Sequence, residues 1–518
     1  MTSPSSPLAW KFAEIARFER DGRYNDNFKA IFIKLRMYSA TSVVEVALRR
    51  LSLPFASLVD ELKSFPWLTL LLVKWALRDG NINIRVGRRI SEQEFEHLLQ
   101  LTWDLHDAGY GARPISNVFL MMRGLIPAQL EFQRPGTWGF LRWPALLARQ
   151  PQGHRARRLF TEEFGVEPAD FADLGLALHG AFLDQPLSVR REWFSPLRGA
   201  YGSAIDRFLD SVSRDLLALR AELQSDQALK NRGRHELVEF PYLKRFPIVR
   251  LRDGSLKCWH PTVFVRGMEE IVHLRLGAHG ANYSEQFSKL FEQYVVELLT
   301  QARCRMVTEA QQWEAFGRAS AAVEAILPFD GCTVFVEAKL GLFGEEVLHT
   351  DSEEAVHAKT KALREAARKA VKVIDAMART PEAFIGCPAT SENFLLVVTN
   401  RELYVRGGEQ LERLYPDGQH VLDTPEAEKL VPLSNIFYVA IDEFERLMGC
   451  VEADTIRLPE FLRQVSRSNG SPEKAKQFLT DYLREYVERW PVPHLLRDAR
   501  RSSEERLTEA LRRPAGKQ

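Results

Sequence analysis

The fold of this chain is decided by one stretch, Val323-Glu324-Ala325-Ile326-Leu327-Pro328-Phe329-Asp330-Gly331-Cys332-Thr333-Val334-Phe335-Val336-Glu337-Ala338-Lys339. Strand-forming apolar residues flank Asp330-Gly331, a dipeptide that favours a two-residue turn between paired strands. The stretch therefore predicts a β-hairpin whose second strand ends in Glu-Ala-Lys. Because side chains alternate along a strand, Glu337 and Lys339 share one face and Ala338 points to the other.

The hairpin is expected to set two carboxylates opposite each other. With Asp330-Gly331 as the turn, Phe329 pairs with Cys332. Counting outward from this pair places Glu324 opposite Glu337, with Cβ atoms roughly 5 Å apart, where like charges repel. A divalent cation between them removes the repulsion, and Mg²⁺ binds carboxylates, waters and phosphate oxygens. A lysine on the same face can position the attacking water or neutralise developing charge. The residues therefore predict a metal-assisted phosphodiesterase site.

Two acids compete for the first metal position. Glu324 has the spacing and the face that the hairpin count requires, whereas Asp330 lies in the expected turn. The strand between them spans about 17–20 Å, which would put Asp330 far from Glu337. We therefore expect Glu324 to bind the metal. A wider or shifted turn would favour Asp330 instead.

The hairpin resembles the core of the PD-(D/E)XK nuclease superfamily, whose third motif matches Glu337-Ala338-Lys339. The superfamily carries an acidic residue on a preceding helix, and Glu292 follows Phe291 in a segment of helical periodicity, 282–295. The resemblance implies one or two Mg²⁺ (or Mn²⁺) ions bound by the Glu324 and Glu337 carboxylates and the Ala338 carbonyl. It implies that Glu292 supports the metal or its waters and that Lys339 assists the attacking water.

A basic helix is expected after the hairpin, where relatives often have a Gln or Lys that faces the site. The segment 363–379 spaces its cationic residues so that they form one stripe. We expect four of them to contact the nucleic-acid backbone: Arg364, Arg368, Lys369 and Lys372. The alternative is an amphipathic helix with a solvated charged face. Two later strand-like runs, 394–398 and 436–441, would complete a small mixed sheet.

Composition bounds the class of protein. With 518 residues the chain is too long for one ordinary domain. A net charge of +1 excludes a globally basic nucleic-acid-binding protein, so any such surface must be local. The scattered cysteines lack zinc-site spacing and indicate thiols in a reducing cytoplasm. The first residues lack the pattern of a signal peptide, and the most apolar run, 67–77, is too short for a bilayer and predicts a buried helix.

These observations predict an α+β multidomain protein. We expect a large, mainly helical N-terminal region for recognition or partner binding (1–235), a restriction-endonuclease-like α/β core (236–450) and a helical C-terminal extension (451–518). The resemblance implies a cytoplasmic, Mg²⁺-dependent endonuclease that cleaves DNA rather than RNA in bacterial defence against phages or plasmids. It also implies control by a phage-derived trigger or by self-association, with no membrane partner.

Two alternatives remain open from the sequence. The superfamily usually has Asp where this chain has Glu324, so the fold could be kept for binding nucleic acid or a partner without catalysis. In addition, Arg266 and His273 are separated by six residues on an expected helix, a spacing that resembles the Arg–His pair of HEPN ribonucleases. The activity of such a ribonuclease would survive EDTA.

Overall fold

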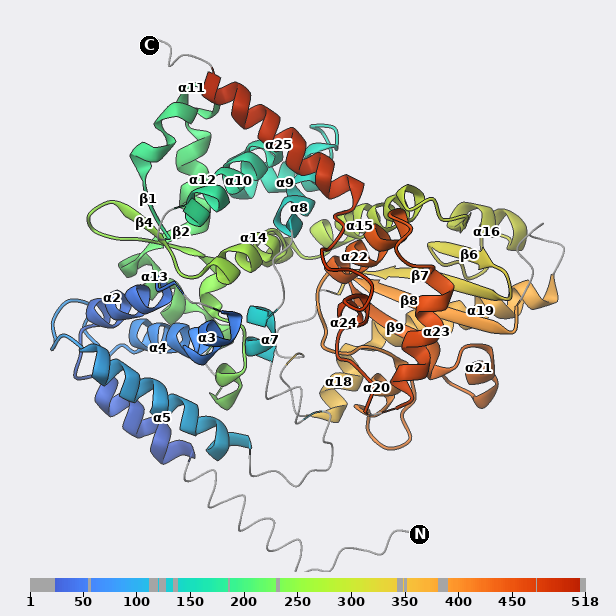
Figure 1. The fold of residues 1–518 in the computed structure, drawn as a ribbon, viewed down its shortest axis with the longest axis horizontal. Coiled ribbons are helices and arrows are strands. Elements are labelled where there is room, and N and C mark those ends of the chain that lie inside the picture. The colour runs from blue at the N-terminus through green and yellow to red at the C-terminus, as the bar shows by residue number, and fades with distance from the viewer. Residues whose placement is uncertain are drawn as a thin grey trace, which may run out of the picture. The chain divides into compact units, whose positions relative to one another are not determined.

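The computed structural model describes residues 24–54, 57–110, 120, 127–133, 138–184, 187–229, 233–341, 348, 352–380, 390–471 and 473–512. They form two compact units, the first within residues 1–148, 160–275 and 502–518 and the second within 149–159 and 276–501. Each unit combines helices with one small mixed sheet (Figure 1). The structure is therefore mixed α and β, as predicted, while the predicted domain boundaries stay predictions.

The sheet of the second unit has the strand order β5-β6-β7-β8-β9. Its strands are β5 (Val307–Thr308), β6 (Ala325–Phe329), β7 (Cys332–Lys339), β8 (Glu392–Thr399) and β9 (Ile436–Ala440). Antiparallel pairs join β5 to β6 and β6 to β7, whereas β8 runs parallel to both β7 and β9. Strands β7 and β8 are buried along almost their whole length, because central parallel strands are covered on both faces.

Strands β6 and β7 form the hairpin that the sequence predicts. Phe329 pairs with Cys332, and the register continues outward without interruption to Ala325 and Val336. Gly331 has a φ of +77°, a left-handed conformation that glycine adopts without steric cost at the second position of a tight turn. The turn chemistry therefore fixes the register, and through it the face on which every side chain of the hairpin lies.

Several helices pack on this sheet, among them three that contact its central strands β7 and β8. Helix α15 (Ala281–Gln301) contacts β7, α19 (Lys361–Arg379) contacts β7 and β8, and α22 (Ile441–Glu452) contacts β8 and β9. Both predicted helices, 282–295 and 363–379, lie within α15 and α19. The predicted strand 436–441 ends one residue early, because Ile441 begins α22. The unit also contains α16 (Glu309–Phe316), α18 (Glu353–Lys359), α20 (Gly408–Glu412), α21 (Pro425–Leu430), α23 (Leu458–Asn469) and α24 (Leu479–Leu483).

The first unit is mainly helical. Its helices are α2 (Ala40–Leu51), α3 (Leu58–Lys63), α4 (Pro66–Arg78), α5 (Glu92–Tyr110), α7 (Pro127–Gln133), α8 (Arg142–Ala148), α10 (Pro168–Asp184), α11 (Arg198–Tyr201), α12 (Ala204–Val212), α13 (Leu216–Ser225) and α14 (Pro261–Leu276), and both units share α9 (Arg155–Phe164) and α25 (His494–Arg512). Helix α4 is buried almost completely, which confirms the buried helix predicted at 67–77. Within the described ranges, no helix has the length and apolar character needed to cross a bilayer.

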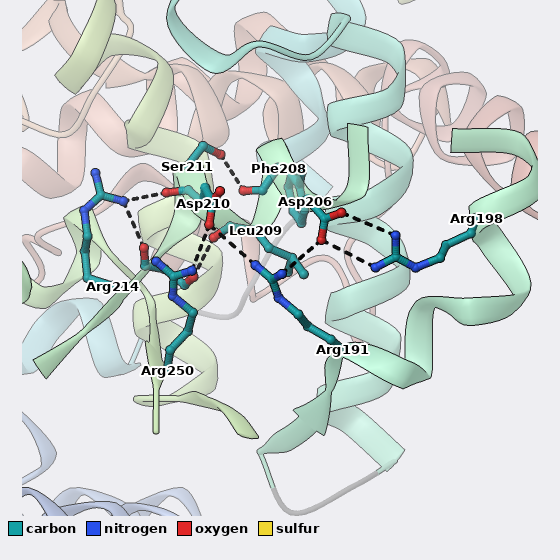
Figure 2. A network of polar contacts seen from close by, with 10 residues as sticks. Arg191, Arg198, Asp206, Phe208, Leu209, Asp210, Ser211, Arg214 and Arg250 are labelled. Atoms are coloured by element: carbon teal, nitrogen blue, oxygen red, sulfur yellow. Dashed lines mark hydrogen bonds and ion pairs between the residues drawn. The ribbon is translucent and has the colours of Figure 1, made fainter. Parts of the chain in front are cut away.

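A small sheet of order β1-β4-β3-β2 completes the first unit, with β1 (Ser188–Arg190), β4 (Ser255–Cys258), β3 (Ile248–Arg250) and β2 (Ser213–Asp215). Figure 2 shows arginines near this sheet that pair with two aspartates of α12. Asp206 lies 3.2 Å from Arg191 and 3.3 Å from Arg198, and Asp210 lies 2.8 Å from Arg250. Each of these arginines faces a carboxylate, and the three arginines and two aspartates together leave one positive charge.

Candidate active site

Two buried acids face each other where β6 begins and β7 ends. Ala325 and Val336 form the outermost pair of the hairpin ladder. The next residues outward are Glu324 and Glu337, which therefore lie opposite each other, as the sequence predicts. Glu337 is fully buried and Glu324 is 7% exposed. Two carboxylates at this depth need a compensating positive charge or a shared proton.

One carboxylate oxygen of Glu337 accepts two hydrogen bonds, whereas the other accepts none from the described residues. Glu337 Oε1 accepts hydrogen bonds from the ammonium groups of Lys339 and Lys369, the second at an Nζ–Oε1 distance of 2.9 Å. Glu337 Oε2 is buried and has no hydrogen-bond partner among the described residues. An orphaned buried acceptor costs on the order of 1–3 kcal/mol. A ligand that reaches this oxygen would therefore be stabilised.

Glu324 is held in place by the backbone of β7. Its Oε2 accepts a hydrogen bond from the Ala338 N–H at 2.8 Å. Burial raises the pKa of Glu324 well above its ordinary value, the charge of Glu337 and a hydrogen bond between the two carboxyls raise it further, and Lys369 and Lys339 lower it. Such a bond needs a proton on one carboxyl. When both are ionised, no donor faces Glu337 Oε2.

The donor set fits a hard divalent cation. Carboxylate and carbonyl oxygens are the ligands that Mg²⁺ and Mn²⁺ prefer, and Glu337 Oε2 is available to bind one. A strand residue directs its N–H and its C=O toward the same neighbouring strand, so the Ala338 carbonyl faces the Glu324 side of β7. Among the described residues, no three Asp, Glu, His or Cys side chains are gathered closely enough to hold an ion by themselves. The hairpin supplies two opposed carboxylates, those of Glu324 and Glu337.

The acid predicted on α15, Glu292, makes a local hydrogen bond, and its charge acts on Glu309. Glu292 Oε1 accepts a hydrogen bond from Ser288 Oγ, one turn earlier on the helix, at 2.9 Å. This bond orients the carboxylate on the helix surface. The charge of Glu292 acts on the same neighbouring acid, Glu309, as the charge of Glu337 does. The role of Glu292 in supporting the metal or its waters stays a prediction of the resemblance.

Glu309 is a further acid at the site that the sequence pattern does not single out. It follows β5 directly and begins α16. Burial raises the pKa of Glu309, Lys369 lowers it, and the charges of Glu292 and Glu337 raise it. The available signal was Thr308 followed three residues later by Gln311, a capping box that the structure forms. This signal fixes the start of a helix without indicating what lies beside it.

Of the four basic residues predicted to bind nucleic acid, Arg364 is used in packing and Arg368 forms a partly exposed ion pair. Arg364 is buried, donates a hydrogen bond to the His357 carbonyl oxygen at 2.5 Å, and lies with its guanidinium carbon 5.3 Å from the centre of the Tyr415 ring. Arg368 pairs with Asp423 at 2.5 Å. Burial removes Arg364 from an exposed cationic stripe, whereas the contact of Arg368 with a nucleic-acid backbone stays a prediction.

The two α19 lysines predicted to bind nucleic acid, Lys369 and Lys372, differ in their surroundings. Lys369 donates to Glu337 and belongs to the site itself. Burial lowers the pKa of Lys369, but the charges of Glu337 and Glu324 raise it above its ordinary value, so its ammonium group stays protonated. Lys372 is exposed, and its contact with a nucleic-acid backbone stays a prediction.

Asp330 lies far from the opposed acids. It occupies the turn, at the opposite end of β6 from Glu324. Its surroundings are a separate hollow, which it lines together with Arg303, Arg305 and Arg457. Of the two acids that compete for the first metal position, only Glu324 lies opposite Glu337.

The residues of the ribonuclease alternative, Arg266 and His273, both lie on α14 but are engaged in packing. The Arg266 guanidinium lies 2.8 Å from Glu131 and 2.8 Å from Glu269. The His273 ring meets the Trp143 ring edge-on, with centroids 4.9 Å apart. These contacts give both side chains a structural role and do not favour that alternative.

The site thus combines two opposed buried carboxylates, two lysines and two acids from neighbouring elements. No protein-family model, curated protein or solved structure matches the chain.

Proposed function

We propose that this chain is a metal-dependent nuclease of the PD-(D/E)XK type, an endonuclease that hydrolyses phosphodiester bonds. One observation carries the proposal: Glu324 and Glu337 face each other across the hairpin, and Glu337 Oε2 has no donor within the described residues. The resemblance in the hairpin motif supports the same chemistry. Two opposed carboxylates repel each other and destabilise a hairpin, and a cation bound between them removes this repulsion.

The chain's own residues would divide the work as follows. Glu324 and Glu337 would hold Mg²⁺, with the Ala338 carbonyl on the same side of β7. A bound Mg²⁺ lowers the pKa of a water ligand and polarises the phosphodiester. Lys369 keeps its charge and offsets negative charge that develops on the phosphate. Lys339, 26% exposed, extends from the same face and can orient the attacking water.

We propose DNA as the substrate and bacterial defence against phages or plasmids as the role, in the cytoplasm and under control of a trigger or of self-association. These finer statements rest on the resemblance alone. The net charge of +1 means that substrate binding must use a local surface. Exposed Lys372 on α19 is the candidate for this contact near the site.

The first experiment incubates the full chain with supercoiled plasmid, linear DNA and total RNA, each with Mg²⁺, Mn²⁺ or EDTA. We expect cutting of plasmid with either cation and none with EDTA. Cutting that persists in EDTA would contradict a metal-dependent site. A preference for RNA would change the substrate and leave the chemistry standing.

Variants at the two competing acids test the metal position. Glu324→Ala removes one of the opposed carboxylates and is expected to lower cleavage at least about 100-fold. Asp330→Ala, at the far end of β6, is expected to leave cleavage little changed. Rates at saturating Mg²⁺ on one plasmid substrate measure both effects. The reverse order of the two variants would move the site to the turn.

Lys369 is expected to contribute through its charge. Lys369→Ala should lower kcat about 100-fold with a smaller change in KM, since a charged donor aimed at developing negative charge acts mainly in the transition state. Lys361→Ala, on the same helix and 73% exposed, is the matched control and should behave as the wild type. Equal losses in both variants would show that only the general charge of α19 matters.

A second candidate function is binding without catalysis. The observation that favours it is the pair of ammonium groups on Glu337 Oε1, which compensates one carboxylate without a metal. In that case the chain would bind nucleic acid equally well with Mg²⁺ and with EDTA and would cut nothing under either condition. A gel-shift titration beside the cleavage assay separates the two functions.

A further inference from the structure

The backbone just before β6 is held by a side chain at a point where the neighbouring strand has already ended. Strand β5 ends at Thr308, which pairs with Ala325 of β6, and the chain then turns into α16. Val323 comes two residues before β6 begins and so lies beyond this last pair. Because Val323 is fully buried, its N–H and C=O groups need partners inside the protein.

Gln312 of α16, which is also fully buried, supplies both partners. Its Oε1 accepts a hydrogen bond from the Val323 N–H at 2.9 Å, and its Nε2 donates to the Val323 carbonyl oxygen at 2.8 Å. Nε2 also donates to the Val307 carbonyl oxygen of β5 at 3.4 Å. The donor and the acceptor of Val323 together fix which end of the amide is nitrogen. The side chain of Gln312 therefore continues the β5–β6 pairing beyond Thr308, in the way that a backbone peptide group would.

This contact lies directly beside one of the two opposed acids. Val323 precedes Glu324 in the chain, and its backbone groups face Gln312 on the β5 side of β6. On the β7 side, the Ala338 N–H donates to the Glu324 carboxylate at 2.8 Å. Gln312 thus fixes the backbone next to Glu324, while Ala338 holds its carboxylate. The two contacts from opposite sides restrict movement of this carboxylate away from Glu337.

Such a restriction matters for the proposed chemistry because metal binding depends on the geometry of the ligands. Mg²⁺ requires near-octahedral coordination with ligand distances of about 2.0–2.1 Å. A displacement of about 1 Å in a site of this kind can cost on the order of 100-fold in rate. The amide of Gln312 is engaged by the backbone groups of Val323 and Val307, so its influence on an ion would pass through Glu324.

We infer that Gln312 is a positioning residue of the site: its amide fixes the backbone at Val323 and thereby keeps the Glu324 carboxylate opposite Glu337. The inference rests on the proposed function for its effect on metal binding and deepens it, because it gives a role to a side chain outside the hairpin motif. The alternative is that Gln312 only stabilises the connection between α16 and β6. In that case its loss would lower the stability without moving the Glu324 carboxylate.

The test compares Gln312→Met with the wild type, both as the full chain and without nucleic acid. Methionine has a similar volume but cannot form the hydrogen bonds to Val323. In metal-free protein we expect the Ala338 amide to exchange its hydrogen about tenfold faster, because a displaced Glu324 carboxylate no longer accepts its hydrogen bond. Electron paramagnetic resonance of free Mn²⁺ measures metal binding. The dissociation constant for Mn²⁺ should rise about 10–100-fold, as when a group that orients a metal ligand is removed.

Gln410→Met is the matched control. Gln410 is another buried glutamine of the same unit, and its Oε1 accepts a hydrogen bond from the Arg406 N–H at 2.8 Å. It lies on α20, which contacts β9, at the opposite edge of the sheet from β5. Thermal melts should show lower stability in both variants, whereas Ala338 exchange and Mn²⁺ affinity should change only in Gln312→Met. If Gln312→Met does not fold, Gln312→Asn, which retracts the amide by one methylene, takes its place under the same criteria.

The outcomes separate this inference from the proposed function. If Gln312→Met leaves Ala338 exchange or Mn²⁺ affinity unchanged, or if Gln410→Met changes both equally, the positioning role is overturned while the nuclease stands. If the wild type binds no Mn²⁺ and cuts nothing, the proposed function is overturned, and Ala338 exchange alone then decides whether Gln312 holds Glu324 in place. Faster exchange at Ala338 with weaker Mn²⁺ binding, in Gln312→Met and not in the control, supports the inference.

Discussion

Replacing Glu337 with Gln is expected to reduce metal-dependent cleavage by roughly a thousandfold or more. The substitution keeps the shape of the side chain but removes the charge that a cation would bind, and metal stabilisation of a phosphoryl transition state is worth several kcal/mol. The variant should stay folded, because Lys339 and Lys369 are 26% and 27% exposed and can turn toward solvent. Single-turnover cleavage at saturating Mg²⁺ measures the effect.

A matched control for this variant is Glu365→Gln. Glu365 lies on α19 with 54% of its side chain exposed and pairs with Lys361 rather than with any group of the site. It should cut as the wild type does. Cleavage retained in Glu337→Gln, with the protein folded, would remove the central residue of the proposed mechanism and shift weight to the binding function.

The second large effect is on stability and concerns the first unit. Glu236→Ala is expected to lower the free energy of unfolding around α4 by about 3–5 kcal/mol, because it leaves the buried ammonium group of Lys74 without its closest carboxylate. Glu236 is 5% exposed, accepts a hydrogen bond from the Trp75 indole at 2.6 Å, and lies 3.4 Å from Lys74. Lys74 is 3% exposed and keeps a longer contact, 3.8 Å, to Glu239 and a position 5.9 Å from the centre of the Tyr242 ring. Hydrogen exchange of the α4 amides measures the local stability.

The pH dependence of this effect has a definite sign. Burial raises the pKa of Glu236, but Lys74 and Arg78 lower it by more, so the folded-state pKa lies below its ordinary value. Such a group stabilises the fold above its unfolded pKa of about 4.3, and the contribution is lost as the pH falls through the lower, folded-state value. The difference between wild type and Glu236→Ala should therefore shrink below about pH 4.

An exposed ion pair in the same unit serves as the control. Glu45 lies 2.7 Å from Arg89, and the two side chains are 44% and 80% exposed. Glu45→Ala should change the stability by less than about 1 kcal/mol, because solvent screens exposed pairs. Similar losses in both variants would mean that burial does not govern the strength of these contacts.

The sequence predicts the hairpin and its register because two local signals agree. Asp330-Gly331 accepts the turn geometry, and the alternation of side chains then fixes which acids share a face. Helices α15 and α19 and strands β8 and β9 are long apolar or amphipathic segments, which periodicity detects well. The hairpin supplies Glu324, Glu337 and Lys339, and α15 supplies Glu292. These four residues are the part of the site that follows from local sequence pattern.

The rest of the site depends on contacts that no local pattern contains. Strand β5 has only two residues, too few for a periodic signal, so nothing in the sequence places Glu309 beside Glu324. The basic spacing of α19 gives no indication that Arg364 packs on Tyr415 while Lys369 reaches Glu337. Charged side chains are long enough to serve either purpose, and the tertiary neighbours decide between them.

The hairpin also restricts how the length of the protein can vary. Removing one residue from β7 between Cys332 and Glu337 would turn the acid to the other face of the sheet, away from Lys369. Removing one residue from each strand would keep Glu324 and Glu337 opposed but would turn both away from α19. Only removal or insertion of residues in pairs on both strands preserves the arrangement. Relatives of this chain are therefore expected to differ in hairpin length by even steps on each strand or not at all, a parity rule that an alignment can check.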